Sequence, residues 1–129
     1  MGDLTKNISR QELACKCGCG LQSMDWETIE IVQECCNHFA TTNNIDRVRL
    51  DIHSAARCYK YNRKPADEGG PGSNDRSQHP KCCAIDFHIH GIKPQKVYDY
   101  LVQKYPNNFG IGNYASFTHI DSRPDKARW

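Results

Sequence analysis

Apolar residues near the start of the chain recur with the period of a helix. In DWETIEIVQECCNHFATTNN they fall at steps of three and four residues, which places them on one helical face. Asp25 stands where an N-cap is expected, and the polar run 41–44 should end the helix. The residues expected in or near the core are Ile29, Val32, Cys35, Cys36 and Phe39.

Two later stretches alternate apolar and polar residues, as strands with one buried face do. RVRLDI is the first, and CAIDFHIH is the second. The apolar positions of the first stretch are Val48, Leu50 and Ile52, and those of the second are Cys83, Ile85, Phe87 and Ile89. Because successive side chains of a strand point to opposite faces, Ala84, Asp86, His88 and His90 share the other face of the second strand.

The last third of the chain predicts one more helix and a closing strand. KPQKVYDYLVQKY has Pro94 near its first turn, and its buried stripe is Val97, Leu101, Val102 and Tyr105. In FGIGNYASFTHIDSR the glycines are expected to form a turn, followed by a strand with Phe117, His119 and Asp121 on one face. Helical and strand periods in this order predict an α+β fold, with an antiparallel sheet and helices packed to one side.

Residues 65–80, PADEGGPGSNDRSQHP, show no periodicity. They predict an ordered surface loop or a mobile flap. A linker between two domains is disfavoured, because the pieces on either side are too small to bury separate cores. With 129 residues, the chain is expected to form a single domain, residues 1–129, with a cysteine-rich N-terminal arm over residues 1–22.

Composition argues against several classes of function. The formal net charge is +2 and there is no basic run, so nucleic-acid binding has little support. No apolar run approaches the ~20 residues of a membrane-spanning helix, so membrane insertion is not expected. The opening MGDLTKNISRQEL lacks the basic and apolar regions of a secretory signal, which predicts a protein made and kept in a cytoplasm.

Eight cysteines are many for a chain of this length. In a secreted domain they would predict a disulfide framework, whereas in a reducing cytoplasm metal ligands or small core residues are favoured. Cys15, Cys17 and Cys19 alternate in CKCGCG and are expected to converge with Cys58. A disulfide set and a structural metal both remain open, although the single-residue spacing differs from the usual Cys-x-x-Cys of zinc sites.

His79 and Asp86 are the first candidates for metal chemistry. Pro80 favours a turn entering a strand over a helix, and such a turn brings His79 back toward Asp86. His119, on a different strand, is the best-placed third ligand. Two imidazoles and one carboxylate would leave the fourth position of Zn²⁺ to water, as in catalytic zinc sites that hydrolyse amides. With six histidines and fifteen acids in the chain, the spacing alone also arises by chance.

Four segments resemble one known family, the zinc D-Ala-D-Ala carboxypeptidases and L-alanyl-D-glutamate endopeptidases with a hedgehog-like fold. SQHPKCCAID resembles the family signature Ser-x-His-x-x-Gly-x-Ala-x-Asp. HSAARCYKYN resembles the family segment Ser-Gly-Tyr-Arg-Cys-Pro-x-x-Asn. ISRQELACKCGCG and FGIGNYASFTHIDSRPDKARW resemble the opening and closing segments of a branch rich in phage and prophage proteins. The resemblance covers nearly the whole chain, in the family's order.

The resemblance implies a Zn²⁺ cofactor held by His79, Asp86 and His119, with the peptidoglycan stem peptide as substrate. Arg57 matches the family arginine that is thought to hold a substrate carbonyl or carboxylate, which suits its fork of donors. The alternative for Arg57 is an ordinary surface salt bridge. Ser77 matches the motif serine and is expected to contact substrate or to support a ligand.

The chain departs from the family pattern where the proton acceptor is expected. Many relatives place an acid three residues before the last histidine or a histidine two before it, where this chain has Ser116 and Phe117. Asp121 is therefore the candidate general base, although it could instead orient a ligand imidazole. Cys82 replaces the motif glycine, and on the strand parity of Asp86 its thiolate would compete with water for the metal.

His88 and His90 share the strand face of Asp86. Residues that neighbour each other on one face lie roughly 6 to 7 Å apart, so either histidine could ligate. The family pattern gives them no role, and we expect them to be solvated or to support the site.

Together these features predict a zinc metallopeptidase that hydrolyses peptidoglycan stem peptides and is encoded by a phage or prophage. It would be a D-Ala-D-Ala carboxypeptidase, an L-Ala-D-Glu endopeptidase or a hydrolase of cross-links, with residues 65–78 shaping the cleft. It would act on the cell wall after release from the host cytoplasm, as an endolysin, or within a virion beside other virion proteins. The alternatives are a non-catalytic structural or wall-binding module and, third, a disulfide-stapled secreted domain.

Overall fold

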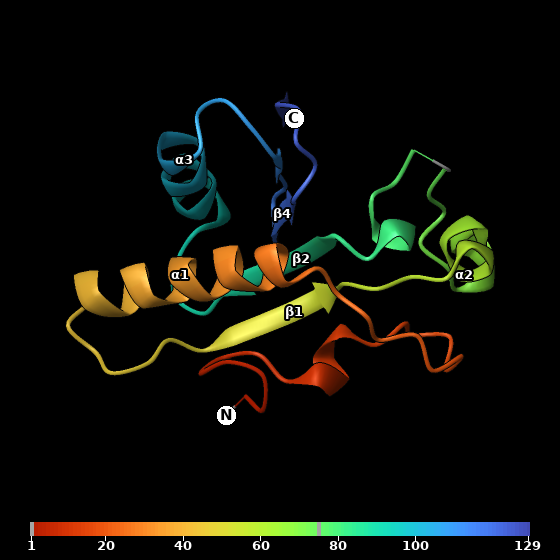
Figure 1. The fold of residues 1–129 in the computed structure, drawn as a ribbon, viewed down its shortest axis with the longest axis horizontal. Helices are drawn as coiled ribbons and strands as arrows, with labels where there is room; N and C mark the ends of the chain where they lie inside the picture. The colour runs from red at the N-terminus through yellow and green to blue at the C-terminus, as the bar shows by residue number, and fades with distance from the viewer. Residues whose placement is uncertain (1, 75) are drawn as a thin grey trace.

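The computed structural model describes residues 2–74 and 76–129, which form one sheet with two long helices on one face (Figure 1). The strands lie in the order β1-β2-β4-β3-β5. They are β1 (Leu50–Ser54), β2 (Ala84–Ile89), β3 (Gly110–Asn113), β4 (Thr118–Asp121) and β5 (Ala127–Arg128). Residue 75, within the loop predicted at 65–78, and residue 1 lie outside the described residues. The predicted α+β class is confirmed.

The sheet is mixed, and its four longer strands form the antiparallel arrangement that was expected. Strands β1, β2, β4 and β3 pair antiparallel, and β5 pairs parallel with β3. The chain reverses direction after β4, so the next strand, β5, runs antiparallel to β4. Because β4 already runs antiparallel to β3, the returning β5 lies parallel to β3 at its free edge.

The two long helices follow the apolar periodicity of the chain. Helices α1 (Trp26–Thr42) and α3 (Pro94–Lys104) pack against β2, β3 and β4. All five core residues expected in the first helix are buried. In α3, Val97 and Leu101 are buried, and Val102 and the C-cap residue Tyr105 pack against the core while partly exposed. Across the described residues, no helix is both long and apolar enough to cross a membrane.

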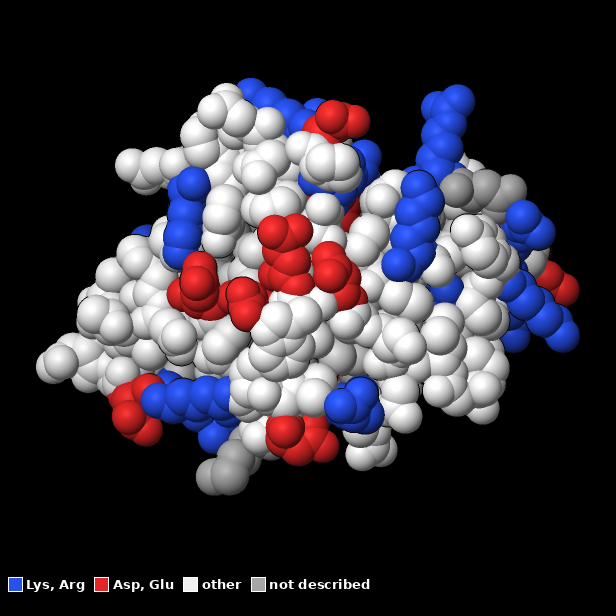
Figure 2. Space-filling model, viewed as in Figure 1, with Lys and Arg blue, Asp and Glu red and all other residues white. Residues whose placement is uncertain are grey.

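The start of α1 differs in detail from the prediction. Asp25 occupies the N-cap position, but its side chain makes no capping hydrogen bond. Its carboxylate instead accepts a hydrogen bond from the Ser122 hydroxyl, just after β4. The residue therefore joins the start of α1 to the segment that follows β4. Figure 2 shows acidic side chains gathered over the part of α1 nearest its start. Glu27 lies in the first turn of α1, where a negative charge interacts favourably with the helix dipole.

The pleat of β2 separates the core from the polar face. Ile85, Phe87 and Ile89 have no exposed surface and lie among the core residues beneath the helices. Each such side chain contributes roughly 1.5–3 kcal/mol by burial, so the strand is firmly held. Asp86 and His88 point the opposite way, as the alternation predicts. The helices and the sheet thus form a rigid support for whatever Asp86 contacts.

Short elements that the periodicity did not predict surround the polar face. They are the 3-10 turns η1 (Arg10–Leu13), η2 (Ala66–Glu68) and η3 (His79–Lys81), and the one-turn helix α2 (Tyr59–Arg63). The loop after α2 folds back on the helix, since Ser73 N donates to Asn62 O (3.0 Å) and Gly72 N to Lys64 O (2.9 Å). These backbone bonds favour the ordered-loop alternative for the described part of the segment.

Cys82 lies before β2, as the C-cap of η3, and not on the strand. Its backbone is left-handed, with φ 56° and ψ 40°. The expectation that it shares the strand parity of Asp86 is therefore wrong. A left-handed residue at this position also accounts for the glycine in the family signature, because glycine adopts positive φ without steric cost.

Replacing Cys82 by glycine should stabilise the protein by about 0.5 kcal/mol. The left-handed conformation costs an L-residue roughly 1–2 kcal/mol, and the entropy that glycine loses on folding offsets part of the gain. The thiol contributes little, since among the described residues its one hydrogen-bond acceptor is Pro80 O, at 4.0 Å. Urea unfolding measures the change. Cys82→Ala is the control, and a glycine variant no more stable than the alanine variant would contradict the expectation.

Candidate metal centre

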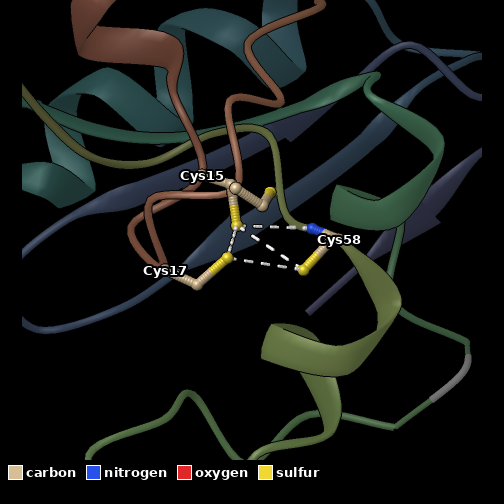
Figure 3. A group of neighbouring side chains, drawn as sticks. Cys15, Cys17 and Cys58 are labelled. Atoms are coloured by element: carbon tan, nitrogen blue, oxygen red, sulfur yellow. Dashed lines mark hydrogen bonds between the residues drawn. The ribbon is translucent and has the colours of Figure 1, made fainter.

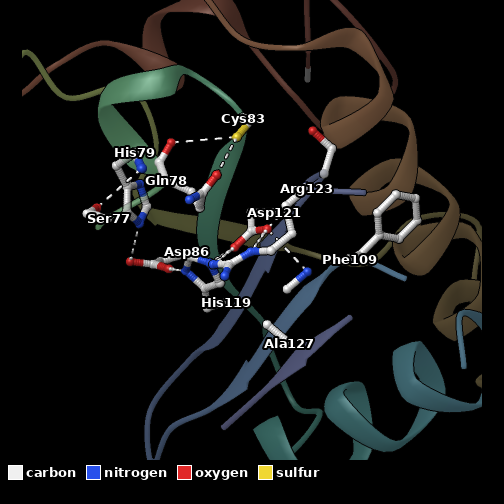
Figure 4. A network of polar contacts seen from close by, with 12 residues as sticks. Ser77, Gln78, His79, Cys83, Asp86, Phe109, His119, Asp121, Arg123 and Ala127 are labelled. Atoms are coloured by element: carbon white, nitrogen blue, oxygen red, sulfur yellow. Dashed lines mark hydrogen bonds and ion pairs between the residues drawn. The ribbon is translucent and has the colours of Figure 1, made fainter. Parts of the chain in front are cut away.

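Three side chains predicted as metal ligands meet on the polar face of the sheet. His79 comes from η3, Asp86 from β2 and His119 from β4 (Figure 4). Asp86 and His119 are direct partners in the β2–β4 ladder, which places their side chains next to each other. One ligand atom from each of the three residues lies within 4.8 Å of the other two, and all three residues are buried. The tertiary structure thus assembles a compact donor set.

The hydrogen bonds of the two imidazoles determine which nitrogen faces this set. His79 Nδ1 lies 2.7 Å from the carbonyl oxygen of Ala55, which can only accept, so Nδ1 carries the proton. Its Nε2 is left 3.2 Å from Asp86 Oδ2. His119 Nδ1 lies 2.7 Å from Asp86 Oδ1, and its Nε2 lies 2.7 Å from Asp121 Oδ2.

This arrangement fits a metal ion. Ligand histidines in proteins usually donate their second ring N–H to a carbonyl or a carboxylate, as His79 does to Ala55 and His119 can do to Asp121. The donor atoms would be His79 Nε2, His119 Nδ1 and the Asp86 carboxylate. Two nitrogens and one carboxylate leave a fourth position open, as in catalytic zinc sites.

Asp86 is ready to bind a cation. Burial alone would raise the pKa of Asp86, but hydrogen bonds with His119 and His79 outweigh burial and hold the pKa of this carboxyl below its usual range. Burial would lower the pKa of His119, yet its hydrogen bonds with Asp121 and Asp86 raise it. The carboxylate therefore stays ionised, and the imidazole holds a proton that a metal would displace.

Asp121 is wholly buried, and its carboxylate is fully engaged. It accepts hydrogen bonds from Arg123 Nε (2.7 Å) and Nη2 (2.8 Å), and from Gly110 N (3.2 Å), besides its contact with His119. Burial would raise the pKa of Asp121, but the hydrogen bonds with His119 and Arg123 lower it. A carboxylate held on every side is a poor proton acceptor and a good anchor for an imidazole.

A cavity of about 360 Å³ opens over the three ligands. Arg57, Ser73 and Ser77 line its polar part. The remaining lining residues outside the donor set are Pro71, Tyr114, Phe117 and Trp129. Tyr114 and Phe117 stack with ring centroids 4.4 Å apart, so an aromatic wall faces the polar groups.

Arg57 is buried, which overturns the alternative of a surface salt bridge. Its Nε donates to Ser54 Oγ (2.9 Å), and its Nη1 donates to Asn62 Oδ1 and Ser73 Oγ (both 3.2 Å). Its Nη2 lies 3.6 Å from Asp86 Oδ2. Burial lowers the pKa of Arg57, and the Asp86 charge opposes that shift, so the guanidinium stays protonated. The fork is thus held rigidly at the edge of the donor set.

The sequence profile described as peptidase M15 matches residues 6–121, which is most of the chain. The chain belongs to the peptidase M15 family. The M15 family are zinc enzymes, and His79, Asp86 and His119 form a candidate metal group in this M15 family member. Membership confirms the predicted family and supports peptidase activity in general. Neither the curated proteins nor the solved structures compared with the chain gave a match.

Two glycines of this M15 family member make room for the site, whereas the sequence predicted that they form a turn. Gly110 and Gly112 lie within β3, opposite Asp121 and His119 in the β3–β4 ladder. A Cβ on Gly110 would meet the Asp121 carboxylate and lie 2.7 Å from Arg123 Nε. A Cβ on Gly112 would lie 2.6 Å from Trp129 Nε1. Strand β3 can therefore lie this close to Asp121 and Trp129 only because positions 110 and 112 carry no side chain.

Gly110→Ala should destabilise the M15 domain by about 1–3 kcal/mol and weaken metal binding, because the new methyl group displaces the locked Asp121 carboxylate. Gly112→Ala is the matched control: the Trp129 side chain in its way is 44% exposed and can move. Thermal unfolding and metal content of both variants test this. Equal effects in the two variants would contradict the assigned role of Gly110.

Other predicted residues of the M15 domain lie around the centre. Ser77 Oγ accepts a hydrogen bond from His79 N (3.3 Å), which supports the turn that carries this ligand. Phe117 lines the cavity as part of the aromatic wall. The Cys82 thiol is not among the potential ligands grouped with His79, so its expected approach to the metal finds no support in the structure.

His88 and His90 form a separate group with Asp51. Asp51 on β1 and His88 on β2 are half-exposed, and His90, just after β2, is exposed. His88 Nδ1 lies 2.8 Å from His53 Nε2, and its Nε2 lies 3.4 Å from Asp51 Oδ2. Neither histidine belongs to the donor set of Asp86. Arg123 was not predicted, although its position two residues after Asp121 was a usable signal.

Proposed function

We propose that this M15 family member is a zinc-dependent peptidase that cleaves peptide bonds in bacterial peptidoglycan stem peptides. The observation that carries the proposal is the buried donor set of His79, Asp86 and His119. The second ring nitrogen of each histidine is already paired, with Ala55 O for His79 and with the Asp121 carboxylate for His119. Its cavity contains one fixed guanidinium and an aromatic wall. Such a set holds three donor atoms close together, as a catalytic metal requires.

The residues around the centre then have distinct tasks. When bound, Zn²⁺ supplies a Lewis acid that polarises a carbonyl and lowers the pKa of water. Arg57 holds a carboxylate or carbonyl of the substrate through the part of its fork beside Asp86. Ser77 supports the turn of His79, and the aromatic wall keeps water from the bound peptide. Stem peptides carry free carboxylates, which suits a cavity with one buried arginine.

We assign Asp121 as a positioning residue for His119. Asp121→Asn should lower zinc affinity about 10–100-fold, as loss of a carboxylate partner to a ligand histidine generally does. Saturating zinc should restore most of the activity, and the pH profile should keep its shape. Activity that stays lost in variant protein loaded with zinc, with a changed pH profile, would instead identify Asp121 as the proton acceptor. Zinc titration followed by assays across pH separates the two roles.

The finer assignment follows the resemblance of the sequence motifs. The bond is the terminal D-Ala-D-Ala bond, the L-Ala-D-Glu bond or a cross-link. A phage or prophage origin would place the protein at the cell wall after release, or in a virion.

One observation favours a second candidate, a peptidase fold that binds the cell wall without cleaving it. Among the described side chains that line the cavity, Asp86 has the sole carboxylate, and it belongs to the donor set. A protein without a proton acceptor would retain the metal and the cavity but turn over no substrate.

Elemental analysis and digestion of purified peptidoglycan fragments test the proposal together. Wild type should hold one more zinc per chain than His79→Ala and should release new fragments, whose masses identify the cleaved bond. His79→Ala should stay folded and release none. Zinc at the site with no cleavage of any fragment would favour the wall-binding module, and no difference in zinc content would reject the metal centre.

A further inference from the structure

Four cysteines converge at one point outside the centre described above. Cys15, Cys17 and Cys19 come from the N-terminal arm, and Cys58 precedes α2. Their sulfur atoms all lie within 4.8 Å of one another. All four are free thiols. We propose that these cysteines bind a second, structural zinc ion as a tetrathiolate site.

The sulfur separations match such a site. Zinc binds thiolates at about 2.3 Å, so a tetrahedron of four sulfurs has edges of about 3.8 Å. Figure 3 shows three of the pairs: Cys15–Cys17 at 3.5 Å, Cys17–Cys58 at 3.6 Å and Cys15–Cys58 at 3.9 Å. A disulfide would bring one pair to about 2.0 Å and separate it from the others. All four sulfurs instead lie within 4.8 Å of one another as free thiols.

The backbone of CKCGCG explains how so short a spacing supplies three ligands. Gly18 and Gly20 have φ of 82° and 92°, a conformation that side chains rarely adopt. Cys15 N donates to Leu21 O (2.7 Å), and Gly18 N donates to Cys15 O (3.3 Å). The loop therefore curls tightly, and its alternating cysteines face one centre.

The surroundings suit thiolates with excess negative charge. Two backbone N–H groups point at sulfur: Cys58 N at Cys15 Sγ and Tyr61 N at Cys58 Sγ, both at 3.4 Å. Four thiolates and one divalent cation carry a net charge of minus two. The basic residues lining the adjacent cavity are Lys16, Lys60, Arg63 and Lys64. Figure 2 likewise shows basic side chains around α2, at the right of the view.

The donor set indicates the metal and its role. Soft thiolate ligands select zinc over calcium or magnesium, and four protein ligands leave no position for substrate. The site joins the arm to Cys58, the residue after Arg57, and Ala56 N donates to Leu13 O (3.0 Å) beside it. The bound ion would therefore hold the segment that carries the buried arginine.

Zinc analysis of His79→Ala tests this site independently of peptidase activity. The variant should keep about one zinc per chain, and X-ray absorption should show a shell of sulfur alone at about 2.3 Å. After cobalt exchange it should show the intense thiolate-to-cobalt absorption of a tetrathiolate site. No zinc in His79→Ala, or a shell containing nitrogen or oxygen, would overturn the inference.

Cys17→Ser in the wild-type background should lose one zinc and the thiolate-to-cobalt absorption, and should unfold at a lower temperature. Cys82→Ala, which removes a free thiol outside the cluster, should keep the zinc content of wild type. Intact mass before and after reduction completes the test. If freshly purified protein is lighter than reduced protein by two hydrogens per cysteine pair, the cysteines form disulfides and the zinc site is rejected, whatever the result of the peptidase assay.

Discussion

Asp86→Asn should reduce stem-peptide cleavage by at least about 10³-fold, because loss of the metal removes several kcal/mol of transition-state stabilisation. The amide keeps the shape of the side chain but not its charge. It would leave His79 and His119 without the anion that lies 3.2 Å and 2.7 Å from their ring nitrogens. The active-site zinc should be lost together with the activity, as measured by elemental analysis and fragment release.

Asp51→Asn is the matched control for this change. Asp51 faces His88 on the neighbouring strand, is half-exposed and lies outside the donor set of Asp86. Its replacement should leave cleavage and zinc content near those of wild type. An Asp86→Asn protein that keeps both its zinc and its activity would show that the metal is held elsewhere.

Arg57→Lys should lower kcat/KM about 10²-fold while leaving the zinc content unchanged, since a misplaced substrate contact costs about this much. Lysine keeps the positive charge but lacks the fork whose arms are held by Ser54, Asn62 and Ser73. The loss should shrink on substrates in which the recognised carboxylate is replaced by an amide. Steady-state kinetics on both substrates measures the difference.

Arg49→Lys provides the comparison for Arg57, because Arg49 precedes β1 and its side chain is 71% exposed. It should have no effect on kcat/KM. An equal loss on acid and amide substrates in Arg57→Lys would indicate that Arg57 supports Asp86 without contacting substrate.

Periodicity predicted the helices and the central strands, because their buried faces follow simple spacing rules. Ile29, Val32 and Phe39 fall on one side of α1, and Ile85 and Phe87 on one side of β2, as expected. The same rule placed Asp86 on the polar face. The one-turn helix α2 and the two-residue strand β5 are too short to show a period, and pairing with distant segments is what defines them.

Glycines and positive-φ residues were the weakest part of the prediction. Gly110 and Gly112 were expected in a turn, and Cys82 on a strand. Their roles depend on atoms far along the chain or on a local backbone twist: the Asp121 carboxylate, the Trp129 ring and the end of η3. A glycine in the sequence shows that a positive φ or a close backbone approach is permitted at that position. It does not show which of the two occurs.

The sequence by itself determined the family, the α+β class and the residues able to act as ligands, because residue types, periods and motifs can be recognised along the chain without its fold. Only the tertiary structure decided how those residues meet. It brought Asp86 beside His119 through strand pairing, turned His79 Nδ1 to the Ala55 carbonyl and surrounded Asp121 with hydrogen-bond donors. It also gathered Cys15, Cys17 and Cys19 around Cys58. These arrangements depend on contacts between segments distant in the chain, which no local pattern encodes.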